Sequence, residues 1–305
     1  MTVLPDRNAG PETTSVSTDF LALTERPVIK RRNIGQIIGV IVVLYVLVLV
    51  AITAVTNPGF GWPTVAQYLF DLRILDGLLV TLELTALAMV LGFIVGLLLA
   101  VMRMSPNWLI RGVAGAYIWF FRGTPLLVQL LFWGFAAILF PTISLGVPFG
   151  PTFFEWDTNT VISLFTAAVL GLGLNEAAYM AEIVRGGILS VPAGQAEAAR
   201  AMGFSHTATL RHIVIPQAMK VIIPPVANNV ISMLKTTSLV IVLGVGDLLY
   251  NTQQIYAKNL EQIPLLIVAS FWYILLTSIL TYVQSLLEKR FSRGAAGTIA
   301  KKGAR

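Results

Sequence analysis

Six long apolar runs alternate with short polar segments along this chain. Each run covers twenty or more residues, and a helix of about 20 residues crosses the ~30 Å hydrocarbon core of a bilayer. A helix also satisfies its own backbone hydrogen bonds there. The pattern therefore predicts an all-α, polytopic membrane protein with about six transmembrane helices. The runs cover residues 37–56, 77–102, 112–140, 160–184, 216–246 and 263–287.

Basic residues between the runs indicate the direction of the chain. They gather before the first run, between the second and third, between the fourth and fifth, and after the sixth, whereas the opposite loops hold only Arg73 and Lys258. Because basic loops stay in the cytoplasm, both termini are expected to be cytoplasmic. The first run is longer than the ~7–15 apolar residues of a signal peptide, so we expect a permanent anchor.

Composition agrees with a membrane location. The 305 residues are 56% hydrophobic and 12% charged, about half the charged share of a soluble domain. The net charge of +6 would suit nucleic acid, but the basic residues flank apolar runs, so no nucleic-acid partner is expected. Cysteine is absent, and His206 and His212 are the two histidines. These counts exclude disulfides and thiolate metal sites, and neither a metal site nor a catalytic site is expected.

One polar segment, "SVPAGQAEAARAMGFSHTATLRHIVIP" (190–216), separates the fourth and fifth runs on the cytoplasmic side. Pro192 suits the first turn of a helix, Gly203 suits a left-handed C-cap, and Ser205 can cap a second helix. The segment therefore predicts a helix–turn–helix. Its first helix is rich in alanine and has little bulky apolar surface to insert into lipid. We interpret it as a hairpin on which another protein docks.

This hairpin resembles the EAA loop of the membrane subunits of ABC importers. The shared residues are Glu197-Ala198-Ala199, Gly203, Ile213 and Ile215-Pro216, and the family usually has leucine where this chain has Ile215. In the family, the loop is the coupling helix that docks in a cleft of the cytoplasmic ATPase. The resemblance implies this coupling role for Glu197, Ala198, Ala199, Arg200, Gly203 and Phe204.

Three further segments resemble permeases for polar amino acids: "YIWFFRGTPLLVQL" (117–130), "NEAAYMAEIVRGGILSVPAGQ" (175–195) and "IPQAMKVIIPPVANNVISMLKTTSL" (215–239). Thr236 is a departure, because the family often has aspartate there. The resemblance implies a permease domain over 61–290 with a type I importer-like core of five helices. The expected additions are a disordered cytoplasmic tail (1–33), an extra transmembrane helix (34–60) and a basic cytoplasmic tail (291–305).

Five charged residues lie deep inside the predicted spans, where each charge costs at least ~2.5–3.5 kcal/mol unless it is paired or hydrated. Depth along the helices predicts two pairings, Glu83 with Lys235 in the outer half, and Arg122 with Glu176 or Glu182 in the inner half. Arg185 offers Glu182 a local alternative. Contact of these charges with the substrate stays open. The five are Glu83, Arg122, Glu176, Glu182 and Lys235.

Helix-breaking residues interrupt two spans. Gly123-Thr124-Pro125 lies in the third run and Pro224-Pro225 in the fifth, and proline removes a backbone hydrogen bond. Broken helices expose backbone groups that transporters use for zwitterionic ligands. The predicted substrate pathway therefore takes in neighbouring small and polar residues, for which helix packing is the alternative role. They are Gly123, Thr124, Gln129, Asn228, Asn229 and Ser232.

These features together indicate a permease subunit of an ATP-driven importer for polar amino acids in a bacterial plasma (inner) membrane. The chain has no GxxxxGK[ST] loop, which ATPases use to bind phosphate. We therefore expect a non-catalytic subunit without a cofactor, and ATP and magnesium on separate ATPase subunits. The other expected partners are a second permease copy or homologue, an extracytoplasmic substrate-binding protein and the lipid bilayer. The acidic outer loops suit such a soluble partner, or are ordinary solvated loops.

Two other functions remain open from the sequence. One is an ABC permease for another small solute, such as an opine or an amino acid derivative. The other is a channel or ion-coupled transporter that needs no ATPase. This second alternative accounts for the charges within the spans, but it leaves the alanine-rich hairpin without a purpose.

Overall fold

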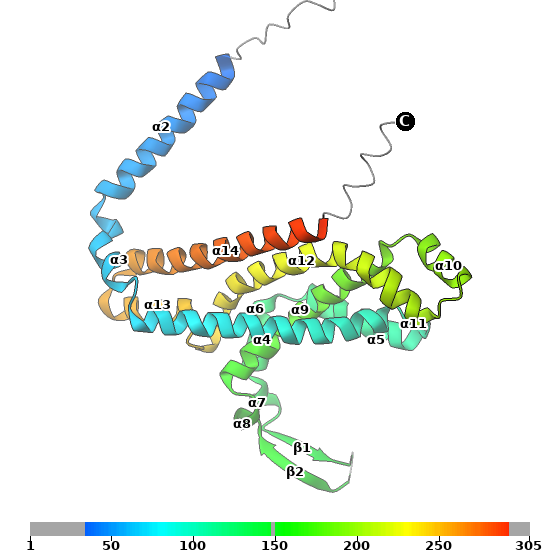
Figure 1. The fold of residues 1–305 in the computed structure, drawn as a ribbon. Helices are drawn as coiled ribbons and strands as arrows, with labels where there is room; N and C mark the ends of the chain where they lie inside the picture. Colours follow the sequence, from blue (N-terminus) through cyan, green and yellow to red (C-terminus); the bar gives the residue numbers. More distant parts are fainter. Residues whose placement is uncertain (1–33, 148–149, 293–305) are drawn as a thin grey trace, which may run out of the picture. The chain divides into compact units, whose positions relative to one another are not determined.

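The structure is a computed structural model that describes residues 34–147 and 150–292 (Figure 1). The chain forms two compact units, Met1–Asn57 and Pro58–Arg305. The tail expected at 1–33 lies outside the described residues, and so does the tail expected at 291–305 except for residues 291–292, which end the last helix. Within the first unit, α2 (Ile34–Thr56) is an uncharged helix without a single buried side chain.

Four long helices dominate the second unit. Gly92 and Gly96 of α4 lie against α9. A Cβ atom added to Gly92 would lie 2.9 Å from Glu176 Cβ, and one added to Gly96 would lie 2.5 Å from Met180 Cβ. Small residues let membrane helices approach this closely, so these two glycines allow α4 and α9 to pack side by side. The four helices are α4 (Leu72–Arg103), α9 (Leu164–Leu189), α12 (Ile215–Thr236) and α14 (Gln262–Ser292).

The third predicted span is a broken helix, as the sequence predicts. α5 (Trp108–Gly123) ends before Pro125, and α6 (Leu126–Gly134) and α7 (Ala136–Leu139) follow. By length and composition, five continuous helices of the described chain could cross a membrane. The α5–α6 segment forms the third predicted span in two pieces, and with it the predicted total of six spans is reached.

The break predicted at Pro224-Pro225 is wrong, because α12 continues through both prolines. Each proline removes one backbone hydrogen bond, and the bonds on either side hold the helix. The irregular turns lie at the two ends of α12 instead. They are the π-helical turn Leu210–Val214 and the 3₁₀ helix η3 (Thr237–Leu243).

One β-hairpin departs from the all-α prediction. β1 (Thr142–Gly146) pairs antiparallel with β2 (Thr152–Asp157), and the short helix α8 (Thr158–Val161) connects β2 to the start of α9. The apolar runs end at residue 140 and resume at residue 160, so the sequence predicts only a loop between them. Its short strands carry no long hydrophobic run that would have indicated a sheet.

The two ends of the bundle carry different short elements (Figure 1). Helices α3 and α13 lie at one end of the long helices, and α10 and α11 lie at the other. At the first end, Asp247 caps α13 by accepting a 2.9 Å hydrogen bond from the Tyr250 N–H group. The short elements are η1 (Pro58–Phe60), α3 (Trp62–Tyr68), α10 (Ala193–Ala201), α11 (His206–Thr209) and α13 (Leu248–Asn259).

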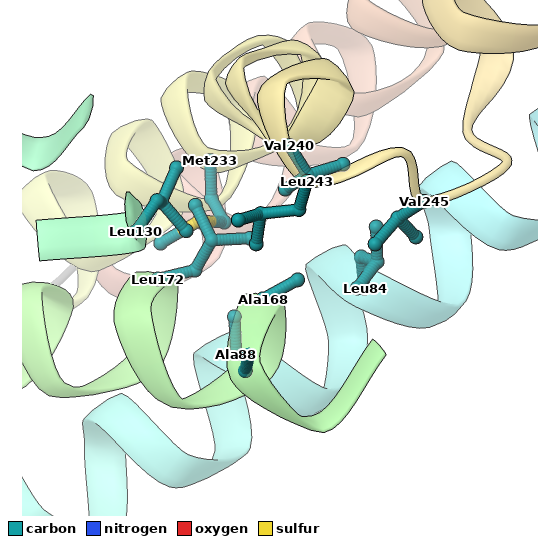
Figure 2. Close-up of a cluster of buried hydrophobic side chains, with 10 residues drawn as sticks. Leu84, Ala88, Leu130, Ala168, Leu172, Met233, Val240, Leu243 and Val245 are labelled. Carbon is teal, nitrogen blue, oxygen red and sulfur yellow. The ribbon is translucent and has the colours of Figure 1, made fainter. Parts of the chain in front are cut away.

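The core holds the broken helix in place. Figure 2 shows Leu130 of α6 among side chains from α9, α12 and η3. A Cβ atom on Gly171 would lie 2.7 Å from Leu130, and one on Gly134 would lie 2.5 Å from Leu243. The backbone of α6 therefore lies tightly between α9 and η3, which fixes the position of the residues at the break.

Candidate functional site

The cytoplasmic hairpin has the predicted helix–turn–helix form. Gly203 adopts φ +88° after α10, in the left-handed region that favours glycine. The turn closes through a 3.1 Å hydrogen bond from the Phe204 N–H group to the Ala199 carbonyl. Ser205 caps α11 by accepting from the Ala208 N–H group at 3.3 Å. The structure therefore confirms the cap at Gly203 and the cap at Ser205.

One residue of α10 is buried where α10 packs against α11 and the π-helical turn Leu210–Val214. Ala199 is 1% exposed, whereas the other residues implied in coupling are all exposed. The hairpin thus presents a surface that its own chain leaves uncovered. The role of this surface in docking an ATPase stays a prediction. The exposed residues are Glu197, Ala198, Arg200, Gly203 and Phe204.

A buried amide repairs the break in the third span. Pro125 has no N–H group, so the carbonyl of Phe121, four residues earlier, loses its helical donor. The Gln129 side chain donates to that carbonyl at 2.9 Å. It also donates to the Thr124 carbonyl at 3.1 Å and to Thr124 Oγ1 at 2.6 Å. Gln129 and Thr124 therefore form one polar site at the break.

Asn175 of α9 completes this site, and the sequence analysis does not single it out. Its amide donates to the Phe121 carbonyl at 3.0 Å and to Gln129 Oε1 at 3.1 Å. Tyr117 of α5 also reaches α9 and donates to the Leu174 carbonyl at 2.9 Å. Asn175 is an amide in the middle of an apolar helix, and a buried amide needs hydrogen-bond partners. That position could have indicated from the sequence that Asn175 belongs to a polar site.

A second polar contact joins α9 to α12. Asn229 donates a 2.6 Å hydrogen bond to Glu176 Oε1, and Glu176 is only 7% exposed. The predicted pairing of Glu176 with Arg122 is wrong. Arg122 is exposed and lies over the ring of Tyr179, 5.4 Å from its centroid. An amide therefore takes the place of the expected cation beside Glu176.

The described residues contain two ion pairs, and one of them lies in a predicted span. Glu182 pairs with Arg185 at 2.6 Å, which confirms the local alternative and makes the pairing of Glu182 with Arg122 wrong. Glu83 and Lys235 do not pair with each other, so that prediction is also wrong. Depth along a helix placed Glu83 and Lys235 in one layer, but it did not show which way their helices face.

Part of the predicted pathway lies on an uncovered stripe of α12. Asn228, Ser232 and Lys235 are all exposed, and their spacing of four and three residues places them on one helix face. Gly123 at the break is also open, with nothing within 4 Å of a Cβ atom placed on it. In a membrane, a second subunit or a watery pathway must cover these groups.

The six predicted pathway residues are therefore not a single cluster. Thr124 and Gln129 lie together at the break, and Asn229 lies beside Glu176. Gly123, Asn228 and Ser232 are uncovered. Among residues 34–147 and 150–292, no group of three or more histidine, aspartate and glutamate side chains is placed to hold a metal ion.

Comparisons with known proteins identify the family. Residues 88–293 match the family described as "binding-protein-dependent transport system inner membrane component". The arginine transport permease ArgU of Corynebacterium glutamicum is 46% identical over 273 residues, which cover 89% of this chain and 84% of that protein. The L-cystine transport permease TcyB of Bacillus subtilis is 37% identical over 236 residues, covering 77% of this chain and 93% of that protein.

A solved structure shares the fold. A chain of a crystal structure titled as an amino acid ABC transporter with histidines is 37% identical and superposes with a TM-score of 0.62. The match covers 74% of this chain and 97% of that chain. These findings confirm the predicted importer fold and the multi-pass location. The chain belongs to the inner membrane component family of binding-protein-dependent transport systems, and it is a multi-pass permease subunit of the inner membrane.

Proposed function

We propose that this permease imports arginine or a similar cationic amino acid, driven by separate ATPase subunits that dock on the hairpin at 190–216. The proposal of arginine as the substrate rests on the 46% identity to an arginine permease over 89% of this chain. An opine is the second candidate, because an octopine permease of Rhizobium radiobacter is 33% identical over 253 residues.

The uncovered polar groups support a substrate pathway along α12 and the break in the third span. Asn228 and Ser232 add neutral hydrogen-bonding groups to one face of α12, and Gly123 leaves its backbone open. Buried Gln129 hydrogen-bonds across the break in the third span, and half-buried Asn229 joins α12 to α9. In this proposal, the uncovered residues meet the substrate and these two amides position them.

Two exposed charges of opposite sign suit a zwitterionic substrate with a cationic side chain. Glu83 of α4 and Lys235 of α12 are exposed and make no ion pair within the described chain. A carboxylate in the pathway attracts a guanidinium or ammonium group, and an ammonium group attracts the α-carboxylate. No ion pair among the described residues neutralises either charge, so both are available to a ligand or a partner.

Energy enters through the partners in this proposal. The hairpin transmits the closure of the ATPases to the membrane helices, and the chain itself supplies no catalytic group and no cofactor. ATP and magnesium are bound by the ATPase subunits. A second permease copy or homologue covers the open stripe of α12, and an extracytoplasmic binding protein delivers the substrate.

Gentle purification of the tagged chain from its native membranes, followed by mass spectrometry, tests the coupling. We expect an ATPase in about equal amount with the wild type. It should be lost with Glu197→Lys and with Gly203→Trp. Glu155→Lys makes the same charge change on the external β-hairpin and should keep the ATPase. A wild-type chain that arrives without an ATPase, under conditions that keep a known importer whole, would favour the channel or ion-coupled alternative.

Uptake into proteoliposomes tests the substrate. The purified importer and its binding protein should accumulate labelled arginine only when ATP is supplied, and unlabelled arginine should compete better than cystine or glutamine. Stronger competition by octopine than by arginine would instead select the opine alternative.

A further inference from the structure

The external β-hairpin is amphipathic. Neighbouring side chains of a strand point to opposite faces of a sheet, and the register pairs Ile143 with Trp156 and Leu145 with Phe154. These four side chains therefore share one face, where the rings of Phe154 and Trp156 stack at a centroid distance of 5.7 Å. The other face carries the polar side chains Thr142, Ser144, Glu155 and Asp157, and Phe153 lies at the bulge between Thr152 and Phe154, where it is 62% exposed.

The described residues leave the apolar face of this hairpin uncovered. Leu145 is 60% exposed, Phe154 is 59% exposed and Trp156 is 45% exposed. An isolated two-stranded hairpin is marginally stable in water, and it gains stability when its apolar face packs against another surface. None of the described residues of Pro58–Arg305 packs on the face in this way, so the face is free to meet another surface.

The apolar face is continuous with an apolar groove beside α6 and α7. Ile143 lines this groove of about 260 Å³ together with Phe132, Leu139, Phe140 and Ile162. The lining contains two side chains with a polar group, Thr158 and Trp133. The Thr158 hydroxyl donates a hydrogen bond to the Phe140 carbonyl. The groove thus offers hydrocarbon contacts, and so does the hairpin face beside it.

We propose that the outer leaflet of the bilayer covers this face, with the hairpin lying in the interfacial layer and a lipid acyl chain in the groove. Aromatic side chains are typical of that layer. The two carboxylates lie on the opposite face, towards water. A soluble partner that comes and goes would leave a bare apolar patch after each cycle, whereas lipid covers it permanently. This surface is separate from the pathway and from the coupling hairpin, so it does not depend on the proposed substrate.

The absence of cysteine allows a clean test with single spin labels. Leu145→Cys labels the apolar face, and Ser144→Cys, one residue away, is its matched control on the polar face. Phe154→Cys and Glu155→Cys form a second pair on the other strand. Each labelled importer, with its ATPase, is placed in lipid nanodiscs, and transport activity shows that the variant is folded. Collisions of the label with oxygen report lipid, and collisions with a water-soluble nickel chelate report water.

We expect labels at Leu145 and Phe154 to favour oxygen over nickel several-fold more strongly than labels at Ser144 and Glu155. Equal access of nickel to both faces would place the hairpin in water and overturn the proposal. Exclusion of both reagents from the apolar face would show that protein covers it, which also overturns the proposal. Repeating the measurement with the binding protein added, and measuring the distance between labels in paired permeases, would then show which protein it is.

Discussion

The side-chain amide of Asn229 on α12 donates a 2.6 Å hydrogen bond to the buried carboxyl group of Glu176 on α9. This contact joins two helices that line the proposed pathway, across 53 residues of sequence. A buried acceptor that loses its donor keeps the full cost of its desolvation. The pair is therefore expected to matter more for the stability of the helix packing than an exposed amide would.

Replacing this donor should destabilise the protein. Asn229→Leu is expected to lower the free energy of unfolding by about 1–3 kcal/mol, because Glu176 is left buried without the amide. Asn228→Leu changes the adjacent exposed amide and should have little effect. The check is thermal unfolding of both variants in the same detergent. Equal losses would show that the contact between Asn229 and Glu176 carries no special weight.

The two amides at the helix break should act as a unit. Gln129→Leu and Asn175→Leu each remove hydrogen bonds to the Phe121 carbonyl. Because the two side chains also bond to each other at 3.1 Å, the double variant should lose less than the sum of the single losses. The expected coupling is about 0.5–3 kcal/mol in the free energy of unfolding. Strictly additive losses would contradict a shared site.

Backbone conformation at the coupling hairpin gives a separate prediction. Gly203 has φ +88° and open space around it, so alanine there meets backbone strain of roughly 1–2 kcal/mol rather than a clash. Asparagine tolerates the left-handed region better. We expect Gly203→Ala to lower the yield of co-purified ATPase and Gly203→Asn to retain most of it. A larger loss with asparagine would indicate a side-chain clash with the partner instead.

Stability should depend on pH through Asp247, which lies outside the membrane spans. Burial raises the pKa of Asp247 to about 6, and its Oδ2 atom has no hydrogen-bond partner among the described residues. Between about pH 4 and pH 6 the folded protein holds a proton that the unfolded chain has lost. The contribution of this residue to stability therefore falls as pH rises through that window and stays low above it.

Asp247→Asn keeps an acceptor for the Tyr250 N–H group and removes the titration. The wild type should lose on the order of 2 kcal/mol of unfolding free energy from this group between about pH 4.5 and about pH 7.5. The variant should show a smaller loss. Unfolding of both proteins at about pH 4.5 and about pH 7.5 is the comparison. Parallel pH profiles would mean that Asp247 titrates normally.

Exchange of the charges at Glu83 and Lys235 gives a further prediction. They form no ion pair in this structure, so the double variant Glu83→Lys with Lys235→Glu should not recover the transport that either single reversal loses. Transport assays of the three variants beside the wild type make the check. Recovery in the double variant would show that the two charges meet in another state of the importer.

The sequence by itself determined the membrane-spanning plan. The length and apolarity of the runs predict transmembrane helices, because a helix of about twenty apolar residues spans the bilayer core and satisfies its own backbone hydrogen bonds there. It also determined the break at Gly123-Thr124-Pro125, where proline removes a local hydrogen bond, and the cap at Gly203, where the turn needs a left-handed residue. These features depend on neighbours a few residues away.

Only the tertiary structure decided how the polar residues pair. Depth along each helix gave the layer of Glu83, Glu176 and Lys235, but the rotation of each helix about its axis decides which side chains meet. That rotation is set by close packing, such as Gly92 and Gly96 of α4 against α9. With the observed rotation, Asn229 contacts Glu176 and the side chain of Lys235 is exposed. The β-hairpin likewise appeared only in the structure, because its register joins residues from two separate strands.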